Sequence, residues 1–341
     1  MTRKASPASL AAVTQWITAA AVAHPHDLPQ HLMQRLDIGR RGAGMLISRL
    51  MAAQWLHNDG TDRRPVYRPG ALRQIVRQYP LDGLQEDMPW RRDFAPHFDL
   101  PIEVRRMAQH AFTELLNNAI DHSGGSTVTV SMRQTPLHLQ LLVSDNGCGL
   151  FERMARSFDI ADPQLAMFEL SKGKLTSQPE RHCGHGLFFA SRLADVFDVH
   201  ANQAAFQHQA WSPQAWRGTK ATPHGGTCVY LAIALDTSRT LESVLRAHSL
   251  DASGHGFDRT EVHLKLLAGT ELLVSRADAR RVASRLEHFG QADIDFSGIE
   301  AVGHGFADEL FRVFRRGHPG VSLQPLGMTP AVSSMVRSVM A

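Results

Sequence analysis

Stretches of helical and of alternating periodicity follow one another along the chain. Apolar residues recur at the three- and four-residue spacing of amphipathic helices over 8–56 and again over 102–122. Polar and apolar residues alternate, as in half-buried strands, over 126–133 and 137–145. From residue 258 onwards, short strand-like pieces alternate with helical ones. The pattern predicts an α+β protein with more than one domain.

Residues 81–100 show no such period and separate the first stretch from the second. They are rich in proline, aspartate and isolated aromatic residues. We interpret them as a linker that packs on the domain following it, which leaves three domains at 1–80, 101–237 and 258–341. The length of 341 residues agrees with this division, because single domains usually stop growing near roughly 250 residues.

The first 80 residues resemble a winged helix-turn-helix module. Helical patterns over 28–36 and 40–56 are joined by a tight turn that contains Gly39, and Asp59-Gly60 is a hairpin signal between two short extended pieces. In such modules the second helix enters the major groove of DNA and the hairpin touches phosphates. The expected contacts are Arg40, Arg41 and Arg49 to bases or backbone, and Arg63 and Arg64 to phosphates.

Charge is distributed unevenly along the chain. The net charge is +3, but residues 1–78 carry +7 (eleven Lys and Arg against four acids), so the remainder carries −4. A basic segment of this kind indicates an anionic partner, and duplex DNA is the partner we expect. The alternatives are a solvated basic surface and a module that binds only protein.

Other features of composition narrow the class of protein. No apolar run approaches the ~20 residues that a membrane span requires, so no membrane partner is expected. Cys148, Cys183 and Cys228 lie far apart and form no CxxC pair, which argues against a disulfide framework or a zinc ribbon and fits a reducing compartment. We therefore expect a cytoplasmic protein.

The middle of the chain holds four polar motifs in a fixed order. Glu114, Asn118 and His122 lie at i, i+4 and i+8 of the helix predicted over 102–122, hence on roughly one face. DNGCGL (145–150) follows the second predicted strand directly, GHGL (184–187) opens an apolar helix, and GGT (225–227) runs into a strand. Each motif alone is weak, but their order and context are specific.

This succession over about 101–237 resembles the GHKL ATPase family, whose fold is an α/β sandwich called the Bergerat fold. The resemblance implies a site for ATP and Mg²⁺, with Asn118 as the magnesium ligand and Asp145 as the acceptor of the adenine amine. The physical chemistry of the residues agrees, because magnesium needs only one or two protein oxygens and a helix N-terminus favours phosphate. The nucleotide-binding residues implied are Asn118, Asp145, Gly147, Gly149, Gly184, His185, Gly186, Leu187 and Thr227.

Glu114 decides what chemistry such a site performs. A glutamate at this position acts as general base on the attacking water in family members that hydrolyse ATP, so the resemblance permits hydrolysis and equally permits kinase chemistry. Residues 151–183 would form a lid of low order over the nucleotide. Lys172 and Lys174 in this segment could contact the γ-phosphate, although a lysine in a polar loop is more often solvated.

The last 84 residues read as an α/β domain. Strands are predicted at 261–267, 271–274 and 321–327, and a helix capped by Ser275 is predicted over 275–289. The stretch DFSGIEAVGHGFADEL (295–310) resembles a STAS-like domain of unknown function, related in layout to anti-anti-sigma factors. In those factors a serine in the turn before the helix is phosphorylated, whereas this turn is Gly303-His304-Gly305 and has no hydroxyl.

Taken together, the patterns predict a cytoplasmic ATP-binding regulator that binds DNA. Two other classes of function remain as alternatives to this prediction. One alternative is a serine/threonine protein kinase of the anti-sigma factor type that acts on a separate partner. The other is a non-catalytic nucleotide-sensing scaffold. A protein partner is expected at the STAS-like domain, and a homodimer is suggested because winged-helix regulators often read two half-sites.

Overall fold

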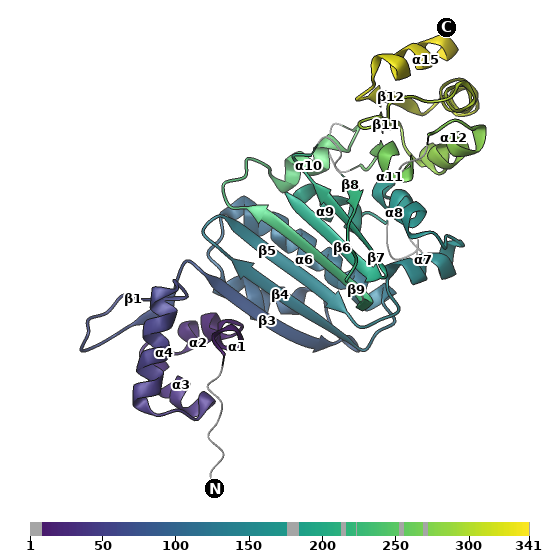
Figure 1. Cartoon of the computed structure of the whole chain (residues 1–341). Helices are drawn as coiled ribbons and strands as arrows, with labels where there is room; N and C mark the ends of the chain where they lie inside the picture. Colours follow the sequence, from purple (N-terminus) through teal and green to yellow (C-terminus); the bar gives the residue numbers. More distant parts are fainter. Residues whose placement is uncertain are drawn as a thin grey trace.

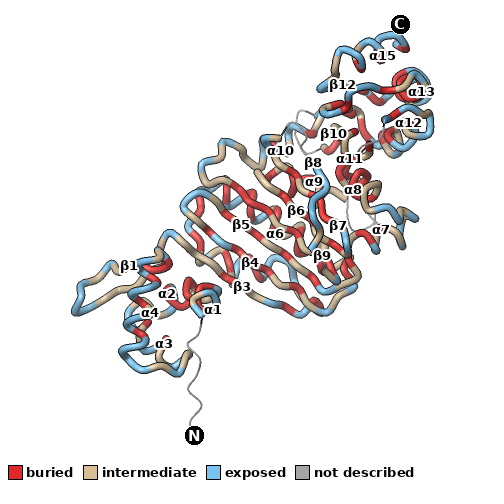
Figure 2. Tube along the Cα trace, in the orientation of Figure 1, coloured by how far each residue is buried: buried red, intermediate tan, exposed pale blue. Residues whose placement is uncertain are grey.

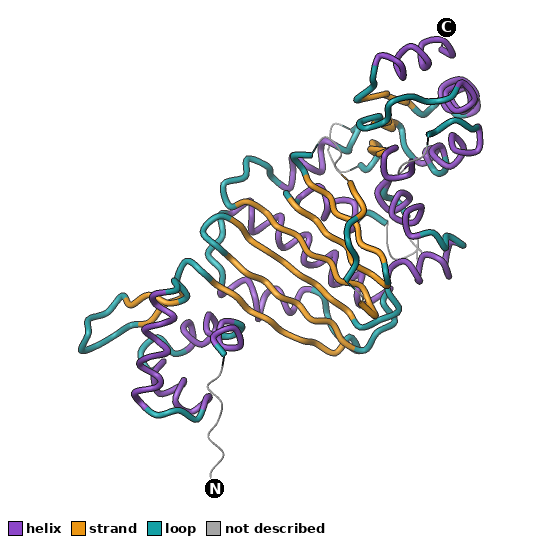
Figure 3. Tube along the Cα trace, viewed as in Figure 1, coloured by secondary structure: helices purple, strands orange, loops and turns teal. Residues whose placement is uncertain are grey.

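The chain folds into three units that follow one another in sequence order from the purple end to the yellow end of Figure 1. The computed structural model describes residues 9–175, 184–212, 216–222, 224–251, 256–268 and 272–340. Figure 3 shows helices at both ends of the molecule and a large sheet between them. The α+β, multi-domain class expected from the sequence is confirmed.

The N-terminal unit is a small helical bundle followed by a hairpin. Its elements are α1 (Leu10–Thr14), α2 (Ile17–Ala23), α3 (Leu28–Leu36), α4 (Arg40–Ala52), β1 (Leu56–Asn58) and β2 (Tyr67–Pro69). Ile17, Leu32 and Leu50 come from three of these helices and are completely buried in one apolar cluster. The expected order of helix, turn, helix and hairpin is observed, and α4 begins at Arg40 despite Gly42 and Gly44.

Strand β3 (Arg73–Pro80) lies outside this unit, although our boundary at residue 80 placed it inside. It pairs antiparallel with β4 and forms one edge of the large sheet. The main-chain N–H groups of Gln74 and Val76 on its outer side donate to Thr18 Oγ1 (3.0 Å) and Gln15 O (3.1 Å). The N-terminal unit therefore covers an edge strand whose N–H groups would otherwise lack partners.

The central sheet has seven strands in the order β3-β4-β5-β9-β6-β7-β8, and all neighbours are antiparallel. The remaining strands are β4 (Thr127–Gln134), β5 (His138–Asp145), β6 (Val196–Asn202), β7 (Ala204–Gln209), β8 (Trp216–Gly218) and β9 (His224–Ala234). Burial alternates along β5 (Figure 2). Leu139, Leu141, Val143 and Asp145 are its buried residues. Asp145 therefore lies on the same face as the apolar core.

Helices α6 (Ile102–His122) and α9 (Gly186–Leu193) cover this inner face (Figure 1). The apolar stripe of α6, which includes Met107, Ala111 and Leu115, is buried against the sheet, as the periodicity predicted. At 21 residues α6 is amphipathic, and none of the described helices is both long and apolar enough to cross a membrane.

The segment 81–100, expected to be a linker, is packed onto α6. It contains α5 (Asp87–Pro89), a π-helical turn η1 (Trp90–Phe94) and a 3₁₀ turn η2 (Ala95–His97). The rings of Trp90 and Phe94 meet the ring of Phe112 edge to face, at centroid distances of 5.3 and 5.2 Å. All three side chains are buried, so this segment contributes to the core of the central domain.

Two helices occupy most of the stretch that we expected to be a lid of low order. They are α7 (Leu150–Phe158) and α8 (Pro163–Lys172), and residues 176–183 of the stretch lie outside the described part of the chain. Asp162 caps α8 by accepting from Gln164 N, Pro163 begins the helix, and Gly173 with φ +77° ends it. These are ordinary helix boundary signals, and our interpretation overlooked them.

The C-terminal unit is an α/β domain built on three parallel strands in the order β10-β11-β12. Helix α10 (Leu241–Ala247) precedes this unit and contacts α9 and α6 of the central domain. The elements of the unit are β10 (Arg259–His263), α11 (Leu264–Ala268), α12 (Arg276–Ala283), η3 (Leu286–His288), β11 (Gln291–Asp295), α13 (His304–Ala307), η4 (Asp308–Phe314), α14 (Arg315–Gly317), β12 (Ser322–Leu326) and α15 (Pro330–Met340). The strand expected over 261–267 ends at His263, and the one expected over 271–274 is reduced among described residues to a bridge between Leu273 and Val302. Ser275 caps α12 as expected.

We predict that Phe112→Ala lowers the free energy of unfolding by about 3–5 kcal/mol, because it removes a buried ring and leaves Trp90 and Phe94 facing a cavity. Urea denaturation followed by circular dichroism measures the change. Ile102→Ala on the same helix is the control, since Ile102 is 68% exposed. A loss below 1 kcal/mol for Phe112→Ala would show that residues 81–100 are only loosely attached.

Candidate functional site

A cavity of about 610 Å³ lies at the end of β5, between the inner face of the sheet and helices α6, α7, α8 and α9. It is the place where the four sequence motifs meet. Nine of the expected site residues line it: Glu114, Asn118, Asp145, Gly149, Gly184, His185, Gly186, Leu187 and Thr227. Gly147, the tenth, lies behind Asp145 and bonds to it.

Asp145 is a buried carboxylate held by the main chain. Its Oδ1 accepts hydrogen bonds from Gly147 N (2.9 Å) and Thr227 N (3.1 Å), which fixes the orientation of the side chain. Its Oδ2 has no partner within the described part of the chain. Burial raises the pKa of Asp145, while the two N–H donors oppose the shift. The site thus offers one fixed acceptor oxygen to a ligand at the bottom of the cavity.

Thr227 donates its main-chain N–H to Asp145 Oδ1 and lines the cavity beside it. Gly147 is needed for this arrangement because a Cβ at that position would overlap the carbonyl of Ser123 at the end of α6. The DNGCGL turn can therefore approach α6 only with glycine at position 147.

Glu114 and Asn118 lie one turn apart on α6 at the other end of the cavity. Both are half-buried, and neither has a hydrogen bond or ion pair with another described residue. The Glu114 carboxylate lies directly against the first turn of α9, since a Cβ at Gly186 would overlap its Oε2. Glu114 and Asn118 thereby place their acceptor oxygens near the N-terminus of α9, which has free N–H groups and is the positive end of the helix dipole.

Arg153 lines the cavity and His110 interacts with the charge of Glu114, and the sequence analysis predicted neither. His110 lies one turn before Glu114; burial lowers its pKa, and the charge of Glu114 opposes this shift. Arg153 of α7 lines the cavity, and its Nε is buried without a partner among described residues. Helix α7 starts at Leu150 and places Arg153 one turn beyond the DNGCGL motif. Predicting this helix from the sequence would therefore have identified Arg153 as a site residue.

His185 is a neutral group at physiological pH. Burial, aided by the charge of Lys174, lowers its pKa to about 4. Its ring packs edge to face on Phe257 of the C-terminal part of the chain, with centroids 4.8 Å apart. His185 therefore contributes shape and hydrogen-bonding capacity to the cavity wall and carries no positive charge.

Lys172 and Lys174 do not line the cavity, so the expected contact with the γ-phosphate is not possible in this structure. Both ammonium groups have protein partners, so they are not simply solvated either. Lys172 is completely buried and its Nζ bonds to Glu169 Oε1 at 2.8 Å. Lys174 Nζ donates to His288 O at 2.7 Å. Both lysines contact the C-terminal domain or the residues that face it.

The central and C-terminal parts of the chain each match a known family model. Residues 103–237 match the family described as histidine kinase-, DNA gyrase B- and HSP90-like ATPase. Residues 278–332 match the STAS-like domain of unknown function. Among curated proteins no match to this chain was found.

The match over 103–237 covers every residue that lines the cavity except Glu86. Such a domain binds a nucleotide, usually with Mg²⁺, and it supports a regulatory role. The two matches confirm the central and C-terminal resemblances drawn from the motifs. The chain therefore contains a GHKL ATPase domain in its centre and a STAS-like domain towards its C-terminus.

Proposed function

We propose that the chain is an ATP-dependent regulator in which the cavity binds Mg-ATP with adenine on Asp145 and the phosphates towards α9. The observation that carries this proposal is the position of Asp145, whose one fixed oxygen leaves the other to accept the exocyclic amine of adenine. Guanine has a carbonyl oxygen at the corresponding position, and a carboxylate would repel it. Arg153, which is unpaired among described residues, supplies positive charge for the phosphates.

The residues at the phosphate end fit a magnesium ion. Asn118 presents an amide oxygen without a protein partner in the described chain, and Glu114 lies one turn away. No group of three or more His, Cys, Asp or Glu able to hold a metal was found among described residues, which agrees with an ion that takes most of its ligands from phosphates and water. When bound, the ion neutralises phosphate charge. Asn118 would hold it and Glu114 would orient a water for attack.

We predict that Asp145→Asn raises the dissociation constant for ATP by a factor on the order of 10 to 100, the value of a hydrogen bond to a charged group. If the amide oxygen keeps the two main-chain N–H bonds, the amide NH₂ faces the adenine amine. Isothermal titration with ATP and magnesium measures the change. Asp198→Asn is the control, because Asp198 is a half-buried aspartate two strands away on the opposite sheet face. Equal affinity of wild type and Asp145→Asn would refute the placement of adenine.

We predict that Glu114→Gln lowers the rate of phosphate release about 100-fold while ATP affinity is retained, because glutamine keeps the volume beside Gly186 and loses the base. A steady-state phosphate assay at saturating ATP measures this. An unchanged rate would remove Glu114 as the base. Transfer of labelled phosphate to a partner protein would favour the anti-sigma type of kinase, and binding without turnover would favour a nucleotide-sensing scaffold.

We further propose that the N-terminal unit is a winged helix-turn-helix that binds duplex DNA. On α4, Ala43, Ile47 and Leu50 are buried, whereas Arg40, Arg41 and Arg49 are exposed on other sides of the helix. Arg40 and Arg41 stand at the positive end of the helix dipole, where cations destabilise a helix. Their position is explained better by an anionic partner than by helix stability.

The hairpin carries Arg63 and Arg64 at an exposed and well-braced turn. Asn58 Oδ1 accepts from Gly60 N (3.0 Å) and Val66 N (2.9 Å), so the turn is fixed from within. Arg68 of β2 pairs with Asp59, whereas the five arginines expected to contact DNA form no ion pair with another described residue. They are free to meet phosphates, as in a wing beside a recognition helix.

We predict that Arg63→Ala with Arg64→Ala reduces the slope of log affinity for duplex DNA against log salt by about 2, because each phosphate contact contributes roughly 0.9. Filter binding from low to moderate salt measures the slope. Arg91→Ala is the control, since Arg91 is also exposed but lies in the central domain. DNA binding that is missing at low salt, or that shows no salt dependence in the wild type, would exclude this function.

A further inference from the structure

Helix α8 lies between the nucleotide cavity and the C-terminal domain. Leu170 on one of its faces lines the cavity, as does Leu175 just beyond its end. Glu169 and Lys172 on the other face are 5% and 0% exposed and are covered by residues of the C-terminal domain. The same short helix therefore forms a wall of the cavity and a docking surface for the neighbouring domain.

A buried ionic network fixes this docking. Lys172 Nζ bonds to Glu169 Oε1 (2.8 Å) and donates to Arg281 O (3.2 Å) and Ser284 O (3.1 Å) in the C-terminal domain. Arg285 donates to Glu169 Oε2 (3.1 Å) and to Gly173 O (2.7 Å). The Lys172 ammonium makes three hydrogen bonds, so moving the domain away from α8 would remove two of its three partners and would separate Glu169 from Arg285.

The backbone at Arg285 indicates that the contact is specific. Arg285 has φ +66°, in the left-handed region that residues other than glycine rarely adopt. Such a conformation persists where the surrounding contacts determine it. Here the contacts are the bonds from the Arg285 guanidinium to Glu169 and Gly173, which lie on the ATPase side of the interface.

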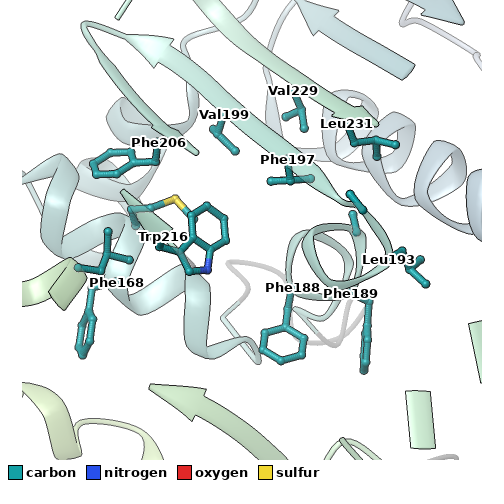
Figure 4. Close-up of a cluster of buried hydrophobic side chains, with 14 of the residues drawn as sticks. Phe168, Phe188, Phe189, Leu193, Phe197, Val199, Phe206, Trp216, Val229 and Leu231 are labelled. Carbon is teal, nitrogen blue, oxygen red and sulfur yellow. The ribbon is translucent and has the colours of Figure 1, made fainter. Parts of the chain in front are cut away.

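A second contact joins the C-terminal part of the chain to the GHGL motif. Phe257 packs on His185, with centroids 4.8 Å apart, and on Phe188, with centroids 4.6 Å apart. Figure 4 shows Phe188 and Phe189 projecting from α9, in the aromatic cluster that this contact extends. A Cβ at Gly173 would overlap the ring of Phe257, so the end of α8 meets the same ring.

We propose that the STAS-like domain regulates the ATP site by holding α8 and the GHGL motif in the shape that binds nucleotide. This inference rests on the proposed binding of ATP in the cavity. Because coupling between two sites is reciprocal, ATP strengthens the docking of the domain as much as the docking strengthens ATP binding. A protein that binds the STAS-like domain and draws it away from α8 would release ATP. The coupling needs no phosphorylation, in keeping with the absence of a hydroxyl at Gly303-His304-Gly305.

The test compares Arg285→Gln with Arg281→Gln in the full chain. Arg285→Gln removes the bonds to Glu169 and Gly173. Arg281→Gln keeps the main-chain oxygen that Lys172 uses and loses only an exposed side chain with its 3.7 Å ion pair to Asp278 on the same helix. We expect Arg285→Gln to weaken ATP binding about tenfold and Arg281→Gln to leave it unchanged. We also expect ATP to slow amide hydrogen exchange over 276–289 in the wild type and in Arg281→Gln, but not in Arg285→Gln.

A folded Arg285→Gln protein with wild-type ATP affinity, or a wild type in which ATP leaves exchange over 276–289 unchanged, would overturn the proposal. If Arg285→Gln fails to fold, the double variant Lys172→Met with Glu169→Gln, which keeps the volume without the charges, decides by the same two measurements. Failure of the wild type to bind ATP at all would instead refute the proposed function. In that case amide hydrogen exchange in α8, measured without nucleotide, still reports on the docking. This exchange should be faster in Arg285→Gln than in Arg281→Gln.

Discussion

The fixed carboxylate of Asp145 connects the sheet, the glycine motifs and the cavity. A charged side chain on the inner face of a sheet is costly unless hydrogen bonds compensate for its burial. Here two main-chain N–H groups do so, one from Gly147 in the turn after β5 and one from Thr227 in the neighbouring strand β9. The bonds set the turn against α6 and bring the start of β9 beside it. The position of this one side chain therefore fixes the end of the cavity.

Much of this arrangement could be predicted from the sequence, because it depends on local order. The alternation along 137–145 places Asp145 inward, and the helical period of 102–122 places Glu114 and Asn118 on one face. The structure brings these residues to one cavity. The N-terminal helices were equally accessible, since their boundaries follow from apolar spacing and from the turn at Gly39.

The features that the sequence did not predict depend mostly on contacts between distant parts of the chain. Strand β3 was assigned to the wrong unit because pairing with β4 cannot be read from a period within 73–80. Lys172 reads as a loop lysine, and only the C-terminal domain, more than 100 residues later, explains its complete burial. Arg153 was missed because helix α7 was taken for an irregular loop. For β3 and Lys172 a tertiary partner overrode the local signal, whereas α7 is a local helix that we overlooked.

The bonds from the outer edge of β3 to Thr18 and Gln15 have a consequence for how the domains of this chain can be separated. The N-terminal unit is hydrogen-bonded to the central sheet and covers its outer edge strand. A fragment that begins at residue 81 would lose a strand and expose the long edge of β4, inviting strands of other molecules to add there. A fragment that keeps β3 but lacks the first helices would expose the unpaired edge of β3 in the same way. Any domain that replaced the N-terminal unit in evolution would therefore also have to cover the hydrogen-bonding edge of β3.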